Sequence, residues 1–177
     1  MSVAALSADS PLALPMNSLH RLLPRGVADD SSWSSHVERY GPLPRLHGRR
    51  SMLLSEVEQS GLAGRGGAGF PTAVKLRTVA AGRSPVVVAN GTEGEPASSK
   101  DEVLLTFNPH LVVDGLLAAM AAVESDEAFV AVSRGARAAH AALGAALAER
   151  RRETPPIRLV SVPTGSWRAR RARSSTG

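Results

Sequence analysis

Three short apolar runs, separated by segments of helical periodicity, constrain the fold of this chain more than any other feature. The runs occupy residues 85–89, 128–132 and 157–162, and Val or Ile recurs in each of them. Continuous apolar runs of this length are typical of strands buried on both faces of a parallel sheet. Helical patterns follow the first two runs, at about 109–123 and 136–152. The alternation predicts an α/β fold, a parallel sheet layered with helices, whose ligands bind beyond the carboxyl ends of the strands.

A glycine-rich stretch at 61–75 is not explained as ordinary core or ordinary linker. It reads Gly-Leu-Ala-Gly-Arg-Gly-Gly-Ala-Gly-Phe-Pro-Thr-Ala-Val-Lys. Such a glycine run is usually kept where the main chain approaches a ligand closely, and Pro71 suits the start of a helix at 71–80. We therefore expect backbone N–H groups and the helix N-terminus to bind a phosphate, with Lys75 adding a positive charge one turn into the helix.

Two other interpretations of this stretch fit its residues less well than a phosphate loop. Gly64, Gly66 and Gly69 fit the dinucleotide fingerprint G-x-G-x-x-G, but that pattern requires a preceding strand, whereas 52–60 has helical character. A flexible linker normally carries serine and other polar residues, whereas this stretch carries Phe70 followed by a helix-starting proline. Both features favour the phosphate loop.

A polar loop at 90–102 follows the first apolar run and leaves the carboxyl edge of the predicted sheet. The amide of Asn90 offers both a donor and an acceptor to a planar heterocycle. A loop that is simply solvated is the alternative. A metal site is disfavoured, because the carboxylates and the histidines of the chain do not have ligand spacings. The polar residues of the loop are Asn90, Thr92, Glu93, Glu95, Lys100, Asp101 and Glu102.

Composition excludes several classes of protein. The chain has no cysteine, so it forms no disulfide and holds no cysteine-ligated zinc or iron–sulfur cluster. Its net charge of +5 comes mostly from an Arg-rich tail, so we expect no nucleic-acid-binding face on the folded part. No apolar run reaches the length of a membrane span, and residues 1–16 lack a secretory-signal pattern. A cytoplasmic protein without membrane insertion is the expectation.

Several motifs, taken together, resemble those of one family. They are Ser-Gly-Leu-Ala-Gly-Arg-Gly-Gly-Ala-Gly-Phe-Pro-Thr at 60–72 with Lys75, Asn-Gly-Thr-Glu-Gly-Glu-Pro at 90–96, Lys100-Asp101, and Pro-His-Leu at 109–111. Over about residues 50–162 the chain closely resembles the flavin-bearing, NADH-oxidising (F-type) subunit of respiratory complex I. That family includes the diaphorase subunits of NAD-dependent hydrogenases and formate dehydrogenases.

This resemblance implies a Rossmann-like FMN-binding domain that accepts hydride from NADH onto the flavin. Other subunits of an NADH-oxidising complex, in a peripheral arm on the cytoplasmic side of the membrane, are the implied partners. The residues that the resemblance places at FMN are Gly64, Arg65, Gly66, Gly67, Lys75, Asn90 and Glu93. Those that it places at NADH are Phe70, at the position of an adenine-stacking aromatic, and Glu95, on the nicotinamide side. It implies no catalytic side chain and no metal ligand in this stretch.

Three departures from the family pattern weaken these contacts. Thr92 stands where the family usually has Asp, and Thr78 where a second adenine-stacking Phe is common. After the third strand the family continues into a Gly-Glu-Glu motif that completes the pocket, whereas residues 166–177 here read Ser-Trp-Arg-Ala-Arg-Arg-Ala-Arg-Ser-Ser-Thr-Gly. That replacement has the composition expected of a reading-frame change or an early stop. The family's four-cysteine iron–sulfur domain is absent from this sequence.

The sequence therefore predicts a loosely ordered leader at 1–48, a partial FMN- and NADH-binding α/β domain at 49–163 and a disordered Arg-rich tail at 164–177. The expected function is that of an NADH dehydrogenase-type flavoprotein domain with weak or absent activity, because the chain has no iron–sulfur centre for onward electron transfer. Two alternatives stay open. One is a non-catalytic nucleotide-binding remnant or regulatory module, and the other is a nucleic-acid-binding protein that uses the arginines at 150–152 and the tail.

Overall fold

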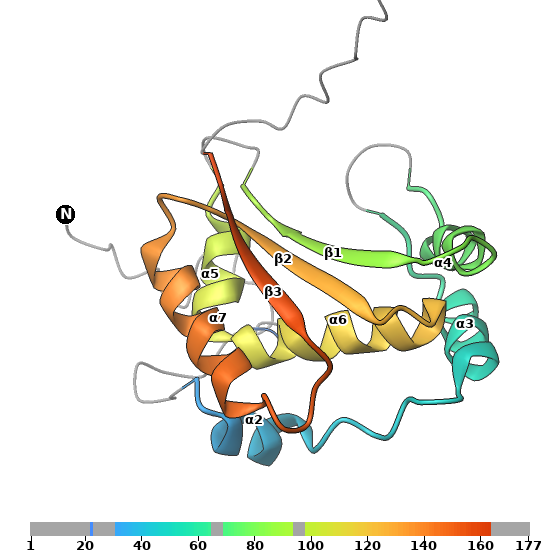
Figure 1. The fold of residues 1–177 in the computed structure, drawn as a ribbon, viewed down its shortest axis with the longest axis horizontal. Helices are drawn as coiled ribbons and strands as arrows, with labels where there is room; N and C mark the ends of the chain where they lie inside the picture. The colour runs from blue at the N-terminus through green and yellow to red at the C-terminus, as the bar shows by residue number, and fades with distance from the viewer. Residues whose placement is uncertain (1–21, 23–30, 65–68, 94–97, 164–177) are drawn as a thin grey trace, which may run out of the picture.

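A three-stranded parallel sheet forms the centre of the domain (Figure 1). The computed structural model describes residues 22, 31–64, 69–93 and 98–163. Its strands are β1 (Val86–Gly91), β2 (Glu127–Ser133) and β3 (Ile157–Val162), in the order β1-β2-β3. The α/β fold predicted from the three apolar runs is confirmed.

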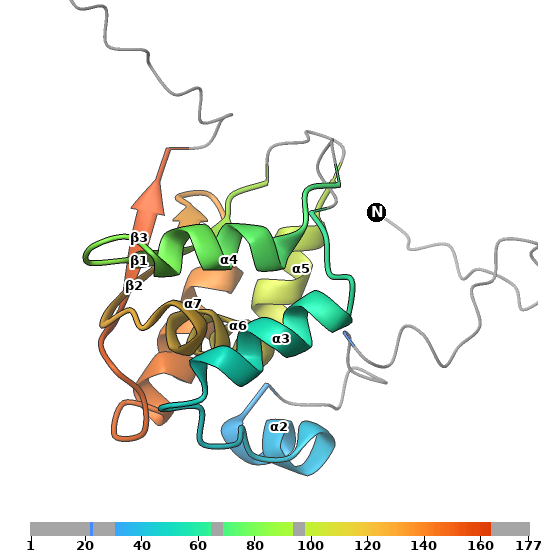
Figure 2. The same cartoon turned by 90° about the vertical axis from the view of Figure 1, so that its right-hand side faces the viewer.

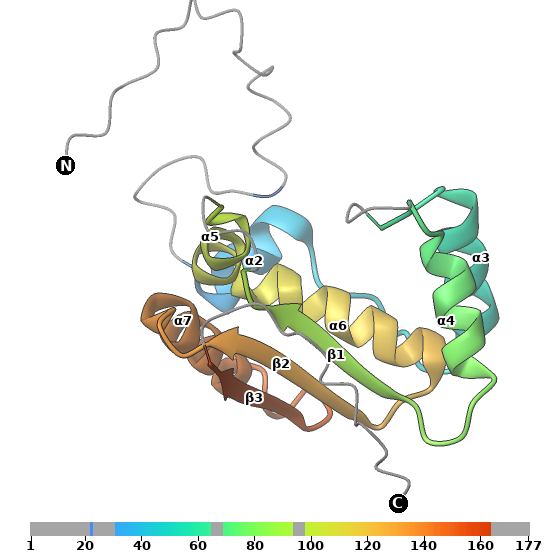
Figure 3. The same ribbon diagram turned by 90° about the horizontal axis from the view of Figure 1, so that it is seen from above.

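Helices cover one face of this sheet. The chain passes from β1 to β2 through α5 (Lys100–Phe107) and α6 (Pro109–Val123), and from β2 to β3 through α7 (Arg137–Glu149). All three lie along the same face (Figures 1 and 3). Both crossovers step across the sheet in the same direction, and parallel crossovers share one hand, so their helices fall on one side.

The helices that precede the sheet pack on α6. They are α2 (Trp33–Tyr40), α3 (Arg50–Gln59) and α4 (Thr72–Ala80), and α3 and α4 lie against each other beside α6 (Figure 2). Within the described residues no single helix is long and apolar enough to cross a membrane. The helices α5 and α6 reach that length only as a pair, and the pair is bent by 97°.

The core lies between the helices and β2, the central strand. Along β2, Ala128, Val130 and Val132 are fully buried and alternate with partly exposed residues. They pack with side chains of α5, α6 and α7, namely Leu105, Leu116, Met120, Ala139 and Leu143. Each of the buried Val, Leu and Met side chains among them contributes about 1.5–3 kcal/mol through the hydrophobic effect.

The opposite face of the sheet is open, and here the prediction of strands buried on both faces is wrong. Val88 of β1 is 57% exposed, and Val86 and Val160 also carry large exposed fractions. The apolar runs predict two-sided burial because composition does not reveal which face the crossover helices cover. That depends on the strand order, which the sequence pattern leaves undetermined.

The helices of the structure differ in part from those predicted. The two patterns at 52–60 and 71–80 correspond to α3 and α4, but Pro71 is the N-cap of α4 rather than its first residue. Two helices were missed. The helix α2 lies within the segment expected to be a loosely ordered leader, and α5 begins inside the stretch expected to be the polar loop at 90–102.

A buried charge cluster fastens α2 to the rest of the domain. It consists of Trp33, His36, His110, Asp114 and Arg150. Asp114 accepts from His36 Nε2 at 2.7 Å and forms an ion pair with Arg150 Nη2, also at 2.7 Å. The Arg150 guanidinium lies 4.1 Å from the centroid of the Trp33 ring, and His110 is almost fully buried beside it. The pKa of His110 is lowered, mainly by burial.

Candidate functional site

The ends of the glycine-rich stretch are held together by the backbone. The Gly64 N–H donates to the Phe70 carbonyl oxygen at 3.0 Å, and Ala63 and Pro71 form an isolated antiparallel bridge. Gly69 has φ +58°, in the left-handed region that favours glycine. The described ends of the stretch, at 63–64 and 70–71, therefore lie together directly before α4.

The helix α4 presents positive charge at the end of this loop. Its N-cap Pro71 makes no side-chain hydrogen bond to the first turn. Lys75, one turn in, is exposed, and no carboxylate of the described residues forms an ion pair with it. Its Nζ lies 6.0 Å from the centroid of the Phe70 ring, which is itself 48% exposed. The first N–H of the helix, that of Thr72, donates to the Leu62 carbonyl oxygen at 2.9 Å. The following N–H groups of the first turn and the Lys75 ammonium group together favour an anion such as phosphate.

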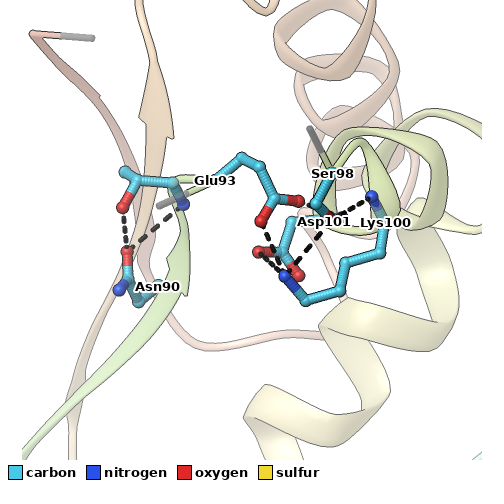
Figure 4. A network of polar contacts seen from close by, with 6 residues as sticks. Asn90, Glu93, Ser98, Lys100 and Asp101 are labelled. Carbon is cyan, nitrogen blue, oxygen red and sulfur yellow. Dashed lines mark hydrogen bonds and ion pairs between the residues drawn. The ribbon is translucent and has the colours of Figure 1, made fainter. Parts of the chain in front are cut away.

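Asn90 stands at the carboxyl end of β1, where the second loop begins. Its Oδ1 accepts from the Thr92 hydroxyl at 2.7 Å and from the Thr92 N–H at 3.2 Å (Figure 4). These two bonds leave the Nδ2 donors of Asn90 available, since no described residue accepts from them. The amide therefore has the free donor that binding to a heterocycle requires.

Glu93 is tied to the start of α5. Its Oε1 accepts from Lys100 Nζ at 2.6 Å and its Oε2 from the Asp101 N–H at 3.2 Å (Figure 4). The hydrogen bond from Lys100 is the largest cause of the lowered pKa of Glu93. The sequence did not reveal this pairing, because it depends on α5 turning Lys100 back toward β1. Both oxygens of Glu93 are thus already engaged within the chain.

Gly91, the last residue of β1, allows α5 to approach the strand. A Cβ atom at this position would lie 2.5 Å from Leu105 Cδ1 and 3.2 Å from the Ala131 carbonyl oxygen. No side chain fits there while Leu105 stays in place. The glycine therefore sets the position of α5, and with it the position of Lys100 relative to Glu93.

The two loops lie at the same end of the domain. The chain reverses between α4 and β1, so α4, which stands beside the start of β1, begins on the side of the domain toward which β1 runs (Figure 3). Gly64, Phe70 and Lys75 lie before or within the first turn of α4, and Asn90 and Glu93 lie at or just after the end of β1. No hydrogen bond or ion pair joins the two sets within the described residues. Arg65, Gly66, Gly67 and Glu95 lie outside the described residues.

A hollow of the described structure lies elsewhere. It has a volume of about 1050 Å³ and is lined by the linker at 42–48, the C-terminal half of α6 and the turn before β3. Its members Ser125, Asp126 and Pro155 immediately precede β2 and β3, so it opens at the amino edge of the sheet. In open parallel sheets ligands bind at the carboxyl edge, so the two loops remain the candidate site.

Comparison with known proteins identifies the family of this chain. Residues 57–168 match the model of the Nuo51 FMN-binding domain family. The chain belongs to this family. The match includes α4, the three strands and both candidate loops, and it confirms the resemblance to the flavin-bearing subunit of complex I. The helix α2 precedes the matched range.

Two similar proteins are subunits of oxidoreductases. The F-type subunit of the NADH-quinone oxidoreductase of Streptomyces coelicolor is 38% identical over 109 residues, which cover 58% of this chain and 24% of that protein. The C-type subunit of the ion-translocating oxidoreductase complex of Pseudomonas aeruginosa is 38% identical over 112 residues, 63% of this chain and 14% of that protein. The chain thus spans a quarter or less of the length of these relatives.

A solved structure contains a chain with a similar fold. The NAD⁺-reducing [NiFe]-hydrogenase in its air-oxidised state contains a chain that matches with a TM-score of 0.59 and 31% identity, over 69% of this chain and 22% of that chain.

The donors at the carboxyl edge fit the cofactor that the family name implies. FMN carries a phosphate and a flat heterocycle. The end of α4 with Lys75 would supply positive charge for the phosphate, and the Asn90 amide would supply a hydrogen-bond donor for the ring.

Proposed function

We propose that this domain binds FMN and NADH at the carboxyl end of β1 and functions as an NADH dehydrogenase-type flavoprotein domain. Two observations carry the proposal. Lys75, in the first turn of α4, pairs with no described carboxylate, and the Asn90 amide, at the carboxyl end of β1, donates to no described residue. Both residues lie within the range that matches the FMN-binding family.

Bound FMN would supply an acceptor for the hydride of NADH. The residues of this chain would bind and orient the two nucleotides. Lys75 and the glycine loop would hold the phosphate and ribityl chain, Asn90 would hydrogen-bond the ring, and Phe70 and Glu95 would lie on the NADH side. Because both oxygens of Glu93 are engaged by Lys100 and Asp101, Glu93 would act by holding the second loop to α5 rather than by direct hydrogen bonding through its carboxylate.

Activity of this chain by itself is expected to be weak or absent. The sequence has no cysteine, so one-electron transfer from the flavin to an iron–sulfur cluster would need cysteines from outside this sequence. Subunits of an NADH-oxidising complex in the cytoplasm are the partners that this proposal includes, because the relatives are subunits of such complexes.

The sequence after β3 supports a reading-frame change as the origin of the Arg-rich segment. The genetic code allows Ser-Trp-Arg-Ala-Arg-Arg at 166–171 to be encoded so that the triplets beginning at the third base of the Ser166 codon give Leu-Ala-Gly-Glu-Glu. This contains the Gly-Glu-Glu motif that the family resemblance leads us to expect after the third strand. The coding DNA tests the idea directly. Codons whose shifted triplets do not spell Gly-Glu-Glu would refute it.

FMN binding to the purified chain tests the proposal. Quenching of FMN fluorescence on titration with protein measures the dissociation constant. Lys75→Ala should weaken binding by about tenfold or more, because a hydrogen bond to a charged group contributes about 1.5–3 kcal/mol. Arg77→Ala is the matched control, since Arg77 lies on the same helix and is paired with Glu58. Absence of binding by the wild-type chain, or equal affinities for wild type and Lys75→Ala, would contradict the proposed site.

NADH reduction of the bound flavin separates the two candidate functions. Bleaching of the flavin absorbance by NADH under anaerobic conditions would support the oxidoreductase domain. A protein that binds FMN at this site and is not reduced by NADH would instead be a non-catalytic nucleotide-binding module. That alternative is favoured by the substitutions at Thr78 and Thr92 and by the unusual sequence after β3.

A further inference from the structure

Thr92 determines which atom of the Asn90 amide is available to a ligand. Its backbone N–H can only donate, and it lies 3.2 Å from Asn90 Oδ1. Its hydroxyl donates to the same oxygen at 2.7 Å (Figure 4). An amide turned the other way would place its NH₂ group against the N–H of Thr92, so the observed orientation is the one that satisfies both groups.

The free end of the amide faces the open side of the sheet. Burial alternates along β1, and Asn90 shares the exposed face with Val86 and Val88. On the neighbouring strands the residues in register with Asn90 are Ala131 and then Val160. Ala131 has a small side chain, so a flat ring can lie on the sheet next to the Asn90 donor.

We propose that Thr92 is a positioning residue that fixes Asn90 as a hydrogen-bond donor toward the ring of the bound nucleotide. The site then selects a ring that presents an acceptor, such as a carbonyl oxygen or an unprotonated ring nitrogen, and disfavours one that presents a donor there. This inference rests on the proposed FMN site.

The residue that the family usually has at this position would behave differently. An Asp in place of Thr92 keeps the backbone N–H but replaces a hydroxyl donor by a carboxylate, which can only accept when ionised. Such a carboxylate attracts the Asn90 NH₂ group and repels its Oδ1. Thr92 therefore changes the hydrogen-bonding character of the site, and the departure from the family pattern has a chemical consequence.

The test compares three substitutions in the full chain with two probes, FMN and riboflavin. Thr92→Val removes the hydroxyl with little change of shape, Thr92→Ser keeps it, and Thr154→Val is the matched control. The Thr154 hydroxyl bonds the Arg150 carbonyl oxygen, away from the site. A net hydrogen bond contributes about 0.5–1.5 kcal/mol, so Thr92→Val should weaken binding by about two- to tenfold.

The pattern across probes separates positioning of the ring from other effects. Thr92→Val should weaken FMN and riboflavin by the same factor, because the contact is to the ring, and Thr92→Ser should restore both. Lys75→Ala should weaken FMN alone, because riboflavin has no phosphate. A wild-type chain that binds FMN, with Thr92→Val binding both probes as tightly as wild type, overturns the role of Thr92 and leaves the proposed function standing. A wild-type chain that binds neither probe overturns both.

Discussion

Arg150→Met should destabilise the domain severely although Arg150 lies far along the chain from the candidate site. Arg150 is 3% exposed, pairs with Asp114 at 2.7 Å and donates to the His110 carbonyl oxygen at 3.3 Å. Removing one partner of a buried ion pair costs about 3–5 kcal/mol, because the other charge stays buried without it. His36 remains at Asp114, so the lower end of the range, about 3 kcal/mol, is expected.

Urea unfolding followed by far-ultraviolet circular dichroism measures this loss. Thermal unfolding is a second measure of the same loss. In a chain of about 150–250 residues, each kcal/mol shifts the melting temperature by about 2–4 °C, so about 3 kcal/mol corresponds to roughly 6–12 °C. Arg151→Met is the matched control, because Arg151 is adjacent, carries the same charge and is exposed. If the two variants differ by less than about 1 kcal/mol, the buried charge cluster does not stabilise the fold as argued.

Three further predictions concern single contacts. Gly91→Ala should lower the free energy of unfolding by about 1–3 kcal/mol, because the added methyl group overpacks against Leu105. In a double-mutant cycle, Leu105→Val should restore part of that loss, and additive effects of the two substitutions would contradict the contact. Burial lowers the pKa of His110, so the native state favours the neutral ring and the protein should lose stability as pH falls below the unfolded pKa of about 6.5. The difference in unfolding free energy between wild type and His110→Gln should therefore narrow from pH 7 to pH 5. A constant difference in urea unfolding would refute this. Lys100→Met should raise the pKa of Glu93, measured by carbon NMR titration of its carboxyl group, since the hydrogen bond from Lys100 is the largest cause of the lowered value; an unchanged titration would refute the pairing.

The sequence predicted the parallel sheet, because that feature depends on local patterns. That the two loops form one site stays a prediction. Continuous apolar runs identify strands, and helices between them imply parallel crossovers. The glycine-rich stretch was placed correctly before a helix because proline marks the start of α4.

The helix α5 was missed because its first turn is charged. Lys100, Asp101 and Glu102 continue the polar composition of the preceding loop, and apolar periodicity begins only at Val103. The same residues suit a helix start, since acidic side chains near the N-terminus interact favourably with the helix dipole. The polar composition of these residues indicates a loop, whereas their interaction with the helix dipole indicates a helix. The packing of Leu105 against β1 favours the helix.

The role of Arg150 was not predictable from its neighbours in sequence. It stands first in a run of three arginines, and such runs are usually solvated charge. In the structure Arg151 and Arg152 are exposed, and Arg150 alone turns inward at the end of α7 to meet Asp114 of α6 and Trp33 of α2. The contact with Trp33 joins residues more than a hundred positions apart, so no local pattern contains it. It also removes Arg150 from the basic surface on which the nucleic-acid-binding alternative was based.

Stability and ligand binding should therefore be separable in this domain. The buried charge cluster ties α2, which precedes the family match, to helices inside the match, whereas the candidate site lies at the end of the sheet away from α2 (Figures 1 and 2). Arg150→Met should lower the melting temperature and leave the affinity for FMN unchanged at a temperature where the variant is folded. Lys75→Ala should weaken FMN binding and leave the melting temperature unchanged. Lys75 is exposed and makes no ion pair with a described residue, so its replacement breaks no such contact. Sites with no shared partners act additively, so the double variant should show both effects at full size. A double variant that lost more stability than the sum would mean that the two ends of the domain are coupled.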